Sequence, residues 1–155
     1  MNEPKKKYHV LARAVITSAD YVMVAHCIGM DNTFLPGGHV EFHEGITTSL
    51  EREIQEELGL DSQVEQYLGL VETDFNLLDV YHQEINHLFA VSIPNLNHTH
   101  NPTSKEEHLE FYWVHVNELE KHNLQPYHVR TIIKDYINET LKGPYFLSTF
   151  NETTQ

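Results

Sequence analysis

One stretch of this chain decides its fold: residues 38–60, which read GHVEFHEGITTSLEREIQEELGL. Its aliphatic residues recur at every fourth position, which places them on one face of an α-helix. A helix with one apolar face buries that face against the rest of the protein. We therefore expect a helix of about three turns through Ile46, Leu50, Ile54 and Leu58.

The sequence also marks the two ends of this helix. Thr48 followed by Glu51 resembles a capping box, in which both side chains bond free backbone N–H groups of the first turn. Gly59 suits the left-handed residue that often follows the last helical residue. These signals predict that Thr48 and Gly59 bound the helix.

Three carboxylates run along the helix beside its apolar face. Glu53 and Glu57 are four residues apart, and Glu56 follows Glu53 by one turn. Like charges at these spacings repel by roughly 0.2–0.5 kcal/mol, and Arg52 can offset only part of this repulsion. Carboxylates on one rigid element suit Mg²⁺ or Mn²⁺, which bind carboxylates and substrate phosphates together. A solvated acidic face is the alternative, but the glycine loop before the helix favours a metal site.

The spacing of the glycine and charged residues matches a known pattern. Gly38 is followed after five residues by Glu44, and after seven more by REIQEELGL at 52–60. This arrangement resembles the Nudix box, G-x5-E-x7-R-E-U-x-E-E-x-G-U with U aliphatic, at every defined position. The resemblance implies an α/β fold, an α/β/α sandwich with a mixed β-sheet between helices. It also implies Mg²⁺-dependent hydrolysis, with Mn²⁺ as a substitute, of a nucleoside diphosphate linked to a group X.

The same resemblance assigns roles to single residues. Arg52 would orient the glutamates through salt bridges and belongs to the expected catalytic set. Glu44 would tether the loop to the helix or join the site through water. The implied metal ligands are three carboxylates and one backbone carbonyl, from Glu53, Glu56, Glu57 and Gly38. His39 and His43 flank these residues, where they could touch substrate or metal or simply face solvent.

Members of the family differ in which carboxylate acts as the general base. Glu56 or Glu57 could serve from within the helix. In the MutT-type pattern a further glutamate precedes a strand tryptophan by six residues, and Glu107 stands at that spacing before Trp113. We therefore include Glu107 among the expected catalytic and metal-binding residues, with its neighbour Glu106 as a competitor.

Length and composition indicate one domain. The chain has 155 residues, of which 40% are hydrophobic and 21% charged, as in an ordinary globular domain. We expect a single domain over residues 1–155, with a core at about 8–141 and short tails. No apolar run reaches the roughly 18 residues of a membrane span, and no secretory signal is apparent. The single cysteine, Cys27, excludes an intramolecular disulfide and fits a cytoplasmic location.

The net charge limits the class of partner. A formal charge of -13 argues against a nucleic-acid partner, because broad binding of nucleic acid needs a surface of lysine and arginine. Divalent ions would reverse the local sign of an acidic cleft. The charge therefore favours a small-molecule nucleotide bridged by metal. Many relatives of the family dimerise, so the resemblance leaves a homodimer open.

Apolar patterns predict the remaining elements. We expect strands at 8–18 and 21–28 with a turn near Ala19-Asp20, and further strands at 63–73, 78–84, 86–93 and 110–116. A short helix is expected to begin at 116–121, and an amphipathic helix spans 127–141. Residues 94–107 read as a polar loop. Residues 143–155 have no periodic pattern and are expected to lie along the surface or to be partly disordered.

Substrate markers are absent. ADP-ribose-type members of the family carry a proline about 16 residues after the box, and diadenosine-polyphosphate-type members carry a tyrosine near there. Phe75, Asn76 and Leu77 occupy this region here. Their identity favours a nucleoside triphosphate, including an oxidised one, cleaved to a nucleoside monophosphate and pyrophosphate.

Several side chains could contact that substrate. Phe75, Tyr81 and Tyr112 offer aromatic faces on which a base can stack, although ordinary packing in the sheet and core is the simpler explanation for each. Arg13 could reach a phosphate or form a surface salt bridge.

Three other functions stay open. The chain could act on a nucleotide sugar or another diphosphate-linked group, or it could bind nucleotides without catalysis. Removal of pyrophosphate from RNA 5′ ends is the third, and the negative charge argues against it.

Overall fold

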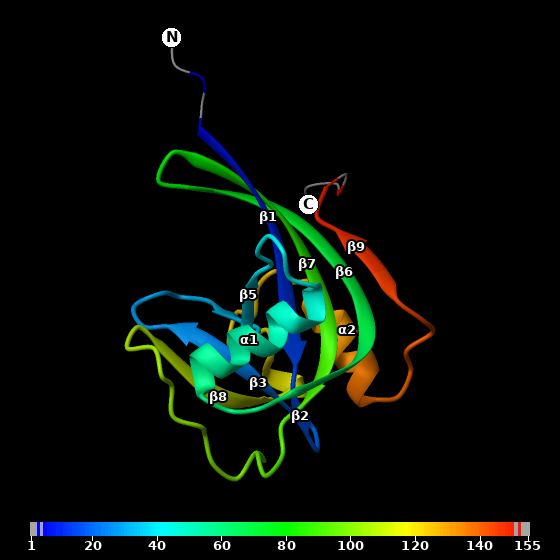
Figure 1. Cartoon of the computed structure of the whole chain (residues 1–155). Coiled ribbons are helices and arrows are strands. Elements are labelled where there is room, and N and C mark those ends of the chain that lie inside the picture. Colours follow the sequence, from blue (N-terminus) through cyan, green and yellow to red (C-terminus); the bar gives the residue numbers. More distant parts are fainter. Residues whose placement is uncertain (1–2, 4, 151, 153–155) are drawn as a thin grey trace.

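Alternating apolar and polar residues build two β-sheets in the computed structural model, which describes residues 3, 5–150 and 152 (Figure 1). The larger sheet has the strand order β5 (Gly37–His39), β1 (Lys5–Val15), β7 (Val80–Ser92), β6 (Gln63–Leu77) and β9 (Tyr145–Ser148). It is a mixed sheet, because β1 pairs with β7 and β6 with β9 in parallel, whereas the other pairs are antiparallel. The smaller antiparallel sheet contains β2 (Thr17–Ser18), β3 (Tyr21–Cys27), β4 (Thr33–Phe34) and β8 (Leu109–His115).

Two helices cover opposite faces of the larger sheet. Helix α1 (Ile46–Leu58) packs with Ala12 and Ala14 in one buried cluster. Helix α2 (Val129–Ile137) packs with Val15 and Leu88 in the other. Neighbouring residues of a strand point to opposite faces, so the two clusters lie on the two sides of the sheet. The structure thereby confirms the expected α/β/α sandwich.

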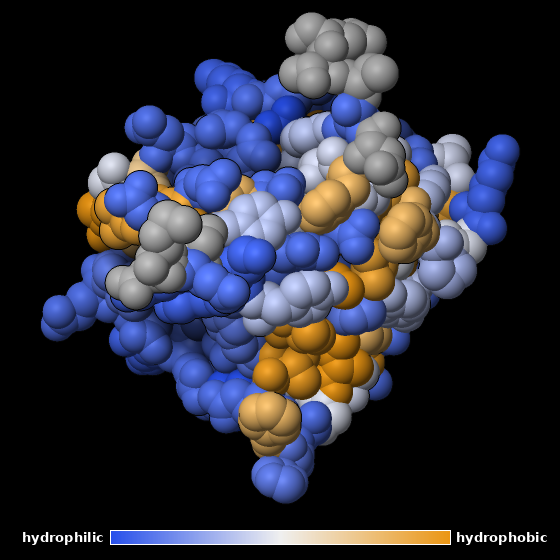
Figure 2. Space-filling view, turned by 90° about the horizontal axis from the view of Figure 1, so that it is seen from above, coloured by the Kyte–Doolittle hydropathy of each residue, from blue (hydrophilic) through white to orange (hydrophobic). Residues whose placement is uncertain are grey.

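A long hairpin formed by β6 and β7 projects beyond the body of the molecule (Figure 1). Its turn consists of Leu78 and Asp79, both with positive φ (50° and 63°), as a tight two-residue turn requires. We predicted separate strands at 78–84 and 86–93, and this was wrong. The strand is continuous because β1 pairs with it from Val80 to Ala90. Figure 2 looks down on this end and shows a mainly hydrophilic surface with separate apolar patches.

The C-terminal part differs most from expectation. Helix α2 is shorter than 127–141, because residues 127–128 form a turn and Glu139 adopts a left-handed φ of 58° just after its end. The expected helix at 116–121 is a 3-10 turn, Val116–Glu118. Residues 145–148 form the edge strand β9 instead of a loose surface segment. Backbone pairing with β6 makes this strand, so it needs no apolar period. Positions 151 and 153–155 lie outside the described residues.

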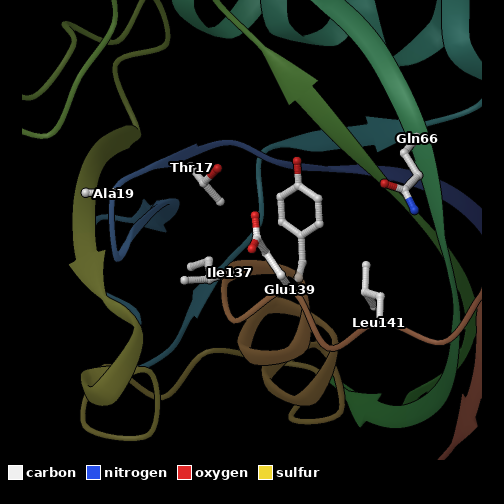
Figure 3. Close-up of a pocket in the computed structure, with 7 residues that line it drawn as sticks. Thr17, Ala19, Gln66, Ile137, Glu139 and Leu141 are labelled. Atoms are coloured by element: carbon white, nitrogen blue, oxygen red, sulfur yellow. The ribbon is translucent and has the colours of Figure 1, made fainter.

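A pocket of about 430 Å³ opens between β6 and the end of α2. Figure 3 shows Gln66 and Glu139 directed into it, with Thr17 across from them. None of the predicted site residues lines this pocket. In the described part of the chain, no helix has the length and apolar character needed to cross a membrane.

Candidate active site

Helix α1 presents its carboxylates because most of its apolar face is buried. Leu50, Ile54 and Leu58 are at most 3% exposed, as the four-residue spacing predicted. Gly59 follows the helix with φ 67° and its N–H bonds the carbonyl of Gln55, which confirms the predicted end. The predicted start at Thr48 was wrong, because the helix begins at Ile46 after Gly45 and has no side-chain cap.

Arg52 ties the preceding loop to the helix by hydrogen bonds that it donates to the loop. Its Nε and Nη2 donate to the two carboxylate oxygens of Glu44 at 3.0 and 2.8 Å. Nη1 donates to Glu53 and Glu56, both at 3.2 Å, and Nη2 also donates to the carbonyl of His39 at 3.3 Å. The bonds from Arg52, helped by the backbone N–H of Glu41, lower the pKa of Glu44 to about 2. The bonds to Glu44 are also the main reason that the pKa of Arg52 is raised.

Glu57 is a buried carboxylate with an incomplete set of partners. Glu57 is only 5% exposed, and its Oε1 accepts from the N–H of Gly37 at 3.3 Å. Oε2 is buried and has no hydrogen-bond partner. Burial, with the nearby charge of Glu53, raises the pKa of Glu57 to about 8 although Arg13 opposes the rise. A buried oxygen without a donor is costly, so this site calls for a positive charge.

Glu53 lies against the glycine turn of β5. A Cβ added to Gly38 would come within 2.5 Å of the carboxyl carbon of Glu53, closer than any real side chain approaches. Burial, as the largest cause, raises the pKa of Glu53 as well. A side chain at position 38 would thus push the Glu53 carboxylate aside, and the two carboxylates Glu53 and Glu57 meet the edge strand at this point.

The donor set fits a hard divalent cation. Two partly or fully buried carboxylates, one with a free oxygen, adjoin a glycine backbone, and such oxygen groups suit Mg²⁺ or Mn²⁺. Within residues 5–150, no three acidic, histidine or cysteine side chains converge closely enough to form a complete metal site. Glu56 is turned to Arg52 and is exposed, so it would have to move to join Glu53 and Glu57.

The loop after β7 brings a fourth carboxylate to this point. The N–H of Lys105 donates to the carbonyl of Glu57 at 2.8 Å and docks the loop on the end of α1. The neighbouring Glu106 is close enough for its charge to raise the pKa of Glu57. Glu107, which the spacing to Trp113 indicated, is exposed. Glu106 lies in a local turn in which the Ser104 hydroxyl donates to its carbonyl and accepts from its N–H, and counting residues could not predict this contact.

Arg13 lies beside the carboxylates and is partly buried. Its Nε donates to Asn86 at 3.3 Å, Nη1 donates to the carbonyl of Leu35 at 3.1 Å, and the guanidinium lies over the ring of Phe34. Burial lowers its pKa, and Glu84, Glu57 and Glu53 oppose this in that order. Arg13 therefore adjoins both the carboxylate cluster and the sheet face on which Glu84 lies.

The predicted stacking residues point in different directions. Phe75 pairs with His82 and lies on the same face of the sheet as Arg13. Tyr81 is one residue away in register, so it lies on the opposite face, where its hydroxyl donates to Asp74 at 2.9 Å. Tyr112 packs against the core cluster of α2.

Sequence reasoning missed several polar residues on the Arg13 face: His9, His82, Glu84 and Asn86. The sequence contains little signal for this face, because polar residues also stand at positions 83 and 87 of β7 and hide the alternation.

Comparisons with known proteins agree with this fold. The MutT protein from Methanosarcina mazei Go1 matches with TM-score 0.64 and 20% identity, over 90% of this chain and 100% of that one. A UDP-X diphosphatase matches with TM-score 0.61 and 21% identity, over 90% and 67%. An ADP-ribose pyrophosphatase from Streptococcus suis matches with TM-score 0.58 and 14% identity, over 90% and 98%. At these identities the likeness shows the fold alone, and a search of curated proteins gave no significant match.

The family model of the NUDIX domain matches residues 7–134, which is most of the chain. This range contains α1, the glycine turn and the loop with Glu106. The chain therefore belongs to the Nudix family, whose members are hydrolases acting on pyrophosphate bonds.

Proposed function

We propose that the chain is a divalent-metal-dependent pyrophosphohydrolase that cleaves a nucleoside triphosphate to a nucleoside monophosphate and pyrophosphate. The observation that carries this proposal is the buried pair Glu53 and Glu57 at the glycine turn, with an unpartnered oxygen on Glu57. Nudix hydrolases generally need a divalent metal, and Mg²⁺ is the ion we expect. Carboxylates gathered on one helix suit an ion that binds protein oxygens and phosphates together.

Each carboxylate has a defined part in this proposal. Glu53, Glu57 and the carbonyl of Gly38 would hold the metal, with Glu56 joining from the Arg52 side. When bound, the metal neutralises phosphate charge and makes a water more acidic. Arg52 orients Glu53 and Glu56 through its hydrogen bonds. Glu106, rather than Glu107, would be the outer carboxylate, because its charge reaches Glu57.

The substrate is expected on the Arg13 face of the sheet. Arg13 is the cation whose charge acts on Glu57, and it would contact a phosphate. Phe75 lies on the same face and would support the base, whereas Tyr81 faces away and has no part in the proposal. The structural neighbours named above differ in the substrate that each name states, so their likeness does not choose among nucleotide classes. The missing proline and tyrosine markers are what favour a triphosphate.

A nucleotide panel tests the proposal. Purified protein is incubated with nucleoside triphosphates, nucleotide sugars and ADP-ribose in Mg²⁺ or Mn²⁺, and the products are separated by ion exchange. We expect monophosphate and pyrophosphate from triphosphates. The variants Glu53→Gln and Glu57→Gln should lose turnover and metal affinity, and Glu51→Gln on the exposed side of α1 is the matched control. Binding of nucleotides without turnover of any would instead make the chain a binding module.

A further inference from the structure

Four ring side chains form a row across the larger sheet. Phe75 on β6 stacks on His82 of β7, with ring centroids 4.7 Å apart and planes 8° apart. His82 stacks on His9 of β1 at 5.1 Å and 13°, and the two rings are linked by nitrogens 2.8 Å apart. His9 in turn contacts His39 of β5, with nitrogens 2.7 Å apart. This ring row lies on the Arg13 face, and Phe75 at its end is 39% exposed.

A single carboxylate, that of Glu84, lies on this face between the ring row and Arg13. Glu84 follows His82 by two residues on β7, and Asn86 follows Glu84 by two, so all three share one face. Asn86 holds Arg13, and its Nδ2 donates weakly to Glu84 at 3.4 Å. Two residues of a strand span roughly 7 Å. Along this face of β7, Asn86 with its bound Arg13, the carboxylate of Glu84 and the ring of His82 therefore follow one another at about this interval.

Glu84 has unused capacity to accept hydrogen bonds. A carboxylate offers about four acceptor positions, and Asn86 is the only side chain that donates to it within the described residues. No lysine, arginine or histidine nitrogen of that part of the chain lies within 4 Å of Glu84, so no ion pair occupies it. It is also partly exposed. An acceptor-only group that stays open on a binding face suits a ligand with hydroxyl or N–H donors.

The order of these groups matches the order of groups in a nucleotide. Phosphates would lie by the carboxylate cluster and Arg13, and the base by Phe75 and His82, where an aromatic face can stack any base. The sugar then falls opposite Glu84. Two neighbouring hydroxyls of a ribose can both donate to one carboxylate, as acidic residues do for ribose in other nucleotide sites. A 2′-deoxyribose loses one of these donors.

We propose that Glu84 recognises the sugar and makes this site selective for ribonucleotides over 2′-deoxyribonucleotides, with the ring row as the base platform. This inference rests on the proposed function, since it assumes that the substrate is a nucleotide whose phosphates lie at Glu53 and Glu57. A hydrogen bond to a charged group that is lost on removal of one hydroxyl lowers kcat/KM by about tenfold or more. Because the preference for ribose depends on the carboxylate of Glu84, removing the charge of Glu84 should abolish it.

The test compares matched substrate pairs, ATP with dATP and GTP with dGTP, in the presence of Mg²⁺. The wild-type protein should favour the ribonucleotide of each pair by about tenfold in kcat/KM. Glu84→Gln should make the kcat/KM values for the ribonucleotide and the 2′-deoxyribonucleotide nearly equal, mainly by lowering the value for the ribonucleotide. Gln83→Ala, which changes the neighbouring residue on the opposite face, should keep the preference. Thermal unfolding of each variant shows whether it is folded, and Glu84→Asp, which keeps the charge, should retain part of the preference.

Equilibrium binding of AMP and dAMP separates the two levels of the proposal. If no nucleotide is hydrolysed, the proposed function fails, but a binding preference for AMP that Glu84→Gln removes would still support the sugar site. Equal kcat/KM and equal binding for both sugars in the wild-type protein overturn the inference. A preference that survives Glu84→Gln, or an equal loss for both sugars, also overturns it, because Glu84 would then act only as a neighbouring charge. Absence of binding and turnover for every nucleotide overturns both.

Discussion

Nδ1 of His9 lies 2.7 Å from Nε2 of His39, the residue that directly follows Gly38. The carbonyl of His39 also accepts from Arg52 at 3.3 Å and from the hydroxyl of Ser49 at 3.2 Å. A ring on the sheet is thereby connected, through one residue of the loop, to the arginine that bonds Glu53 and Glu56. The ring row and the carboxylate cluster are parts of one hydrogen-bonded framework.

Removing His9 should loosen the loop that carries Gly38. For His9→Ala we expect kcat to fall by about tenfold or more, because small displacements of catalytic groups are costly. Steady-state kinetics with the preferred nucleotide measure this, and KM should change less. Tyr8→Ala, at an exposed neighbouring position on the other face, serves as the control. Unchanged kcat in a folded His9→Ala protein would refute the connection.

Arg52→Lys should damage the site although the charge is kept. A lysine cannot form the paired bonds to Glu44 and also reach Glu53 and Glu56. We expect a loss of stability of about 1–3 kcal/mol in urea unfolding, together with a loss of activity. Lys121→Ala removes an exposed pair with Glu118 and should cost less than about 1 kcal/mol. Equal effects of the two changes would contradict the role of Arg52.

Gly38→Ala should disturb the site, because the new methyl group would overlap the carboxylate of Glu53 and push it aside. Displacing Glu53 should weaken Mg²⁺ binding and lower turnover, whereas the stability should change little because the overlapping atoms are the end of a flexible side chain. Gly45→Ala is the matched control, since nothing lies within 4 Å of its added Cβ. Calorimetric titration with Mg²⁺ measures the affinity, and wild-type affinity in Gly38→Ala would argue against a metal site here.

Without metal, the stability of the protein should fall as pH rises. Folding raises the pKa of Glu57 from 4.5 to about 8, so the folded state favours the protonated carboxyl. Its contribution is fully present below pH 4.5 and is lost as pH rises through about 8. The loss should be on the order of a few kcal/mol, measured by urea unfolding in EDTA. Glu57→Gln should remove this slope, and Mg²⁺ should reverse it. An identical slope in wild type and variant would contradict the shift.

Glu106 and Glu107 form a natural pair for comparison. Glu106→Gln should lower kcat, since its charge acts on Glu57, whereas Glu107→Gln changes an exposed side chain and should have little effect. Both proteins should unfold at similar temperatures, because neither change touches the core. A larger loss of activity in Glu107→Gln would restore the assignment made from its spacing to Trp113.

Local patterns predicted α1 well because its determinants lie close together in the chain. The buried face, the left-handed Gly59 and the bonds of Arg52 to Glu44, Glu53 and Glu56 all depend on spacings of at most eight residues. The predicted cap at Thr48 failed, since the contact that fixes the start is formed by Glu44 and His39 in the loop. Edge strand β9 could not be predicted, because it is held by backbone pairing with a strand about 75 residues earlier.

The sequence by itself determined the family, the helix and the identity of the acidic residues. Only the tertiary structure decided which of these residues meet. Parallel pairing of β1 with β7 brings Arg13 to Asn86 and His9 to His82, and the docking of Lys105 on Glu57 brings Glu106 close enough for its charge to act on Glu57. Charge and hydrogen bonding act over a few ångströms. Residues that are far apart in the chain therefore acquire a shared chemistry only when strand register and loop contacts place them side by side.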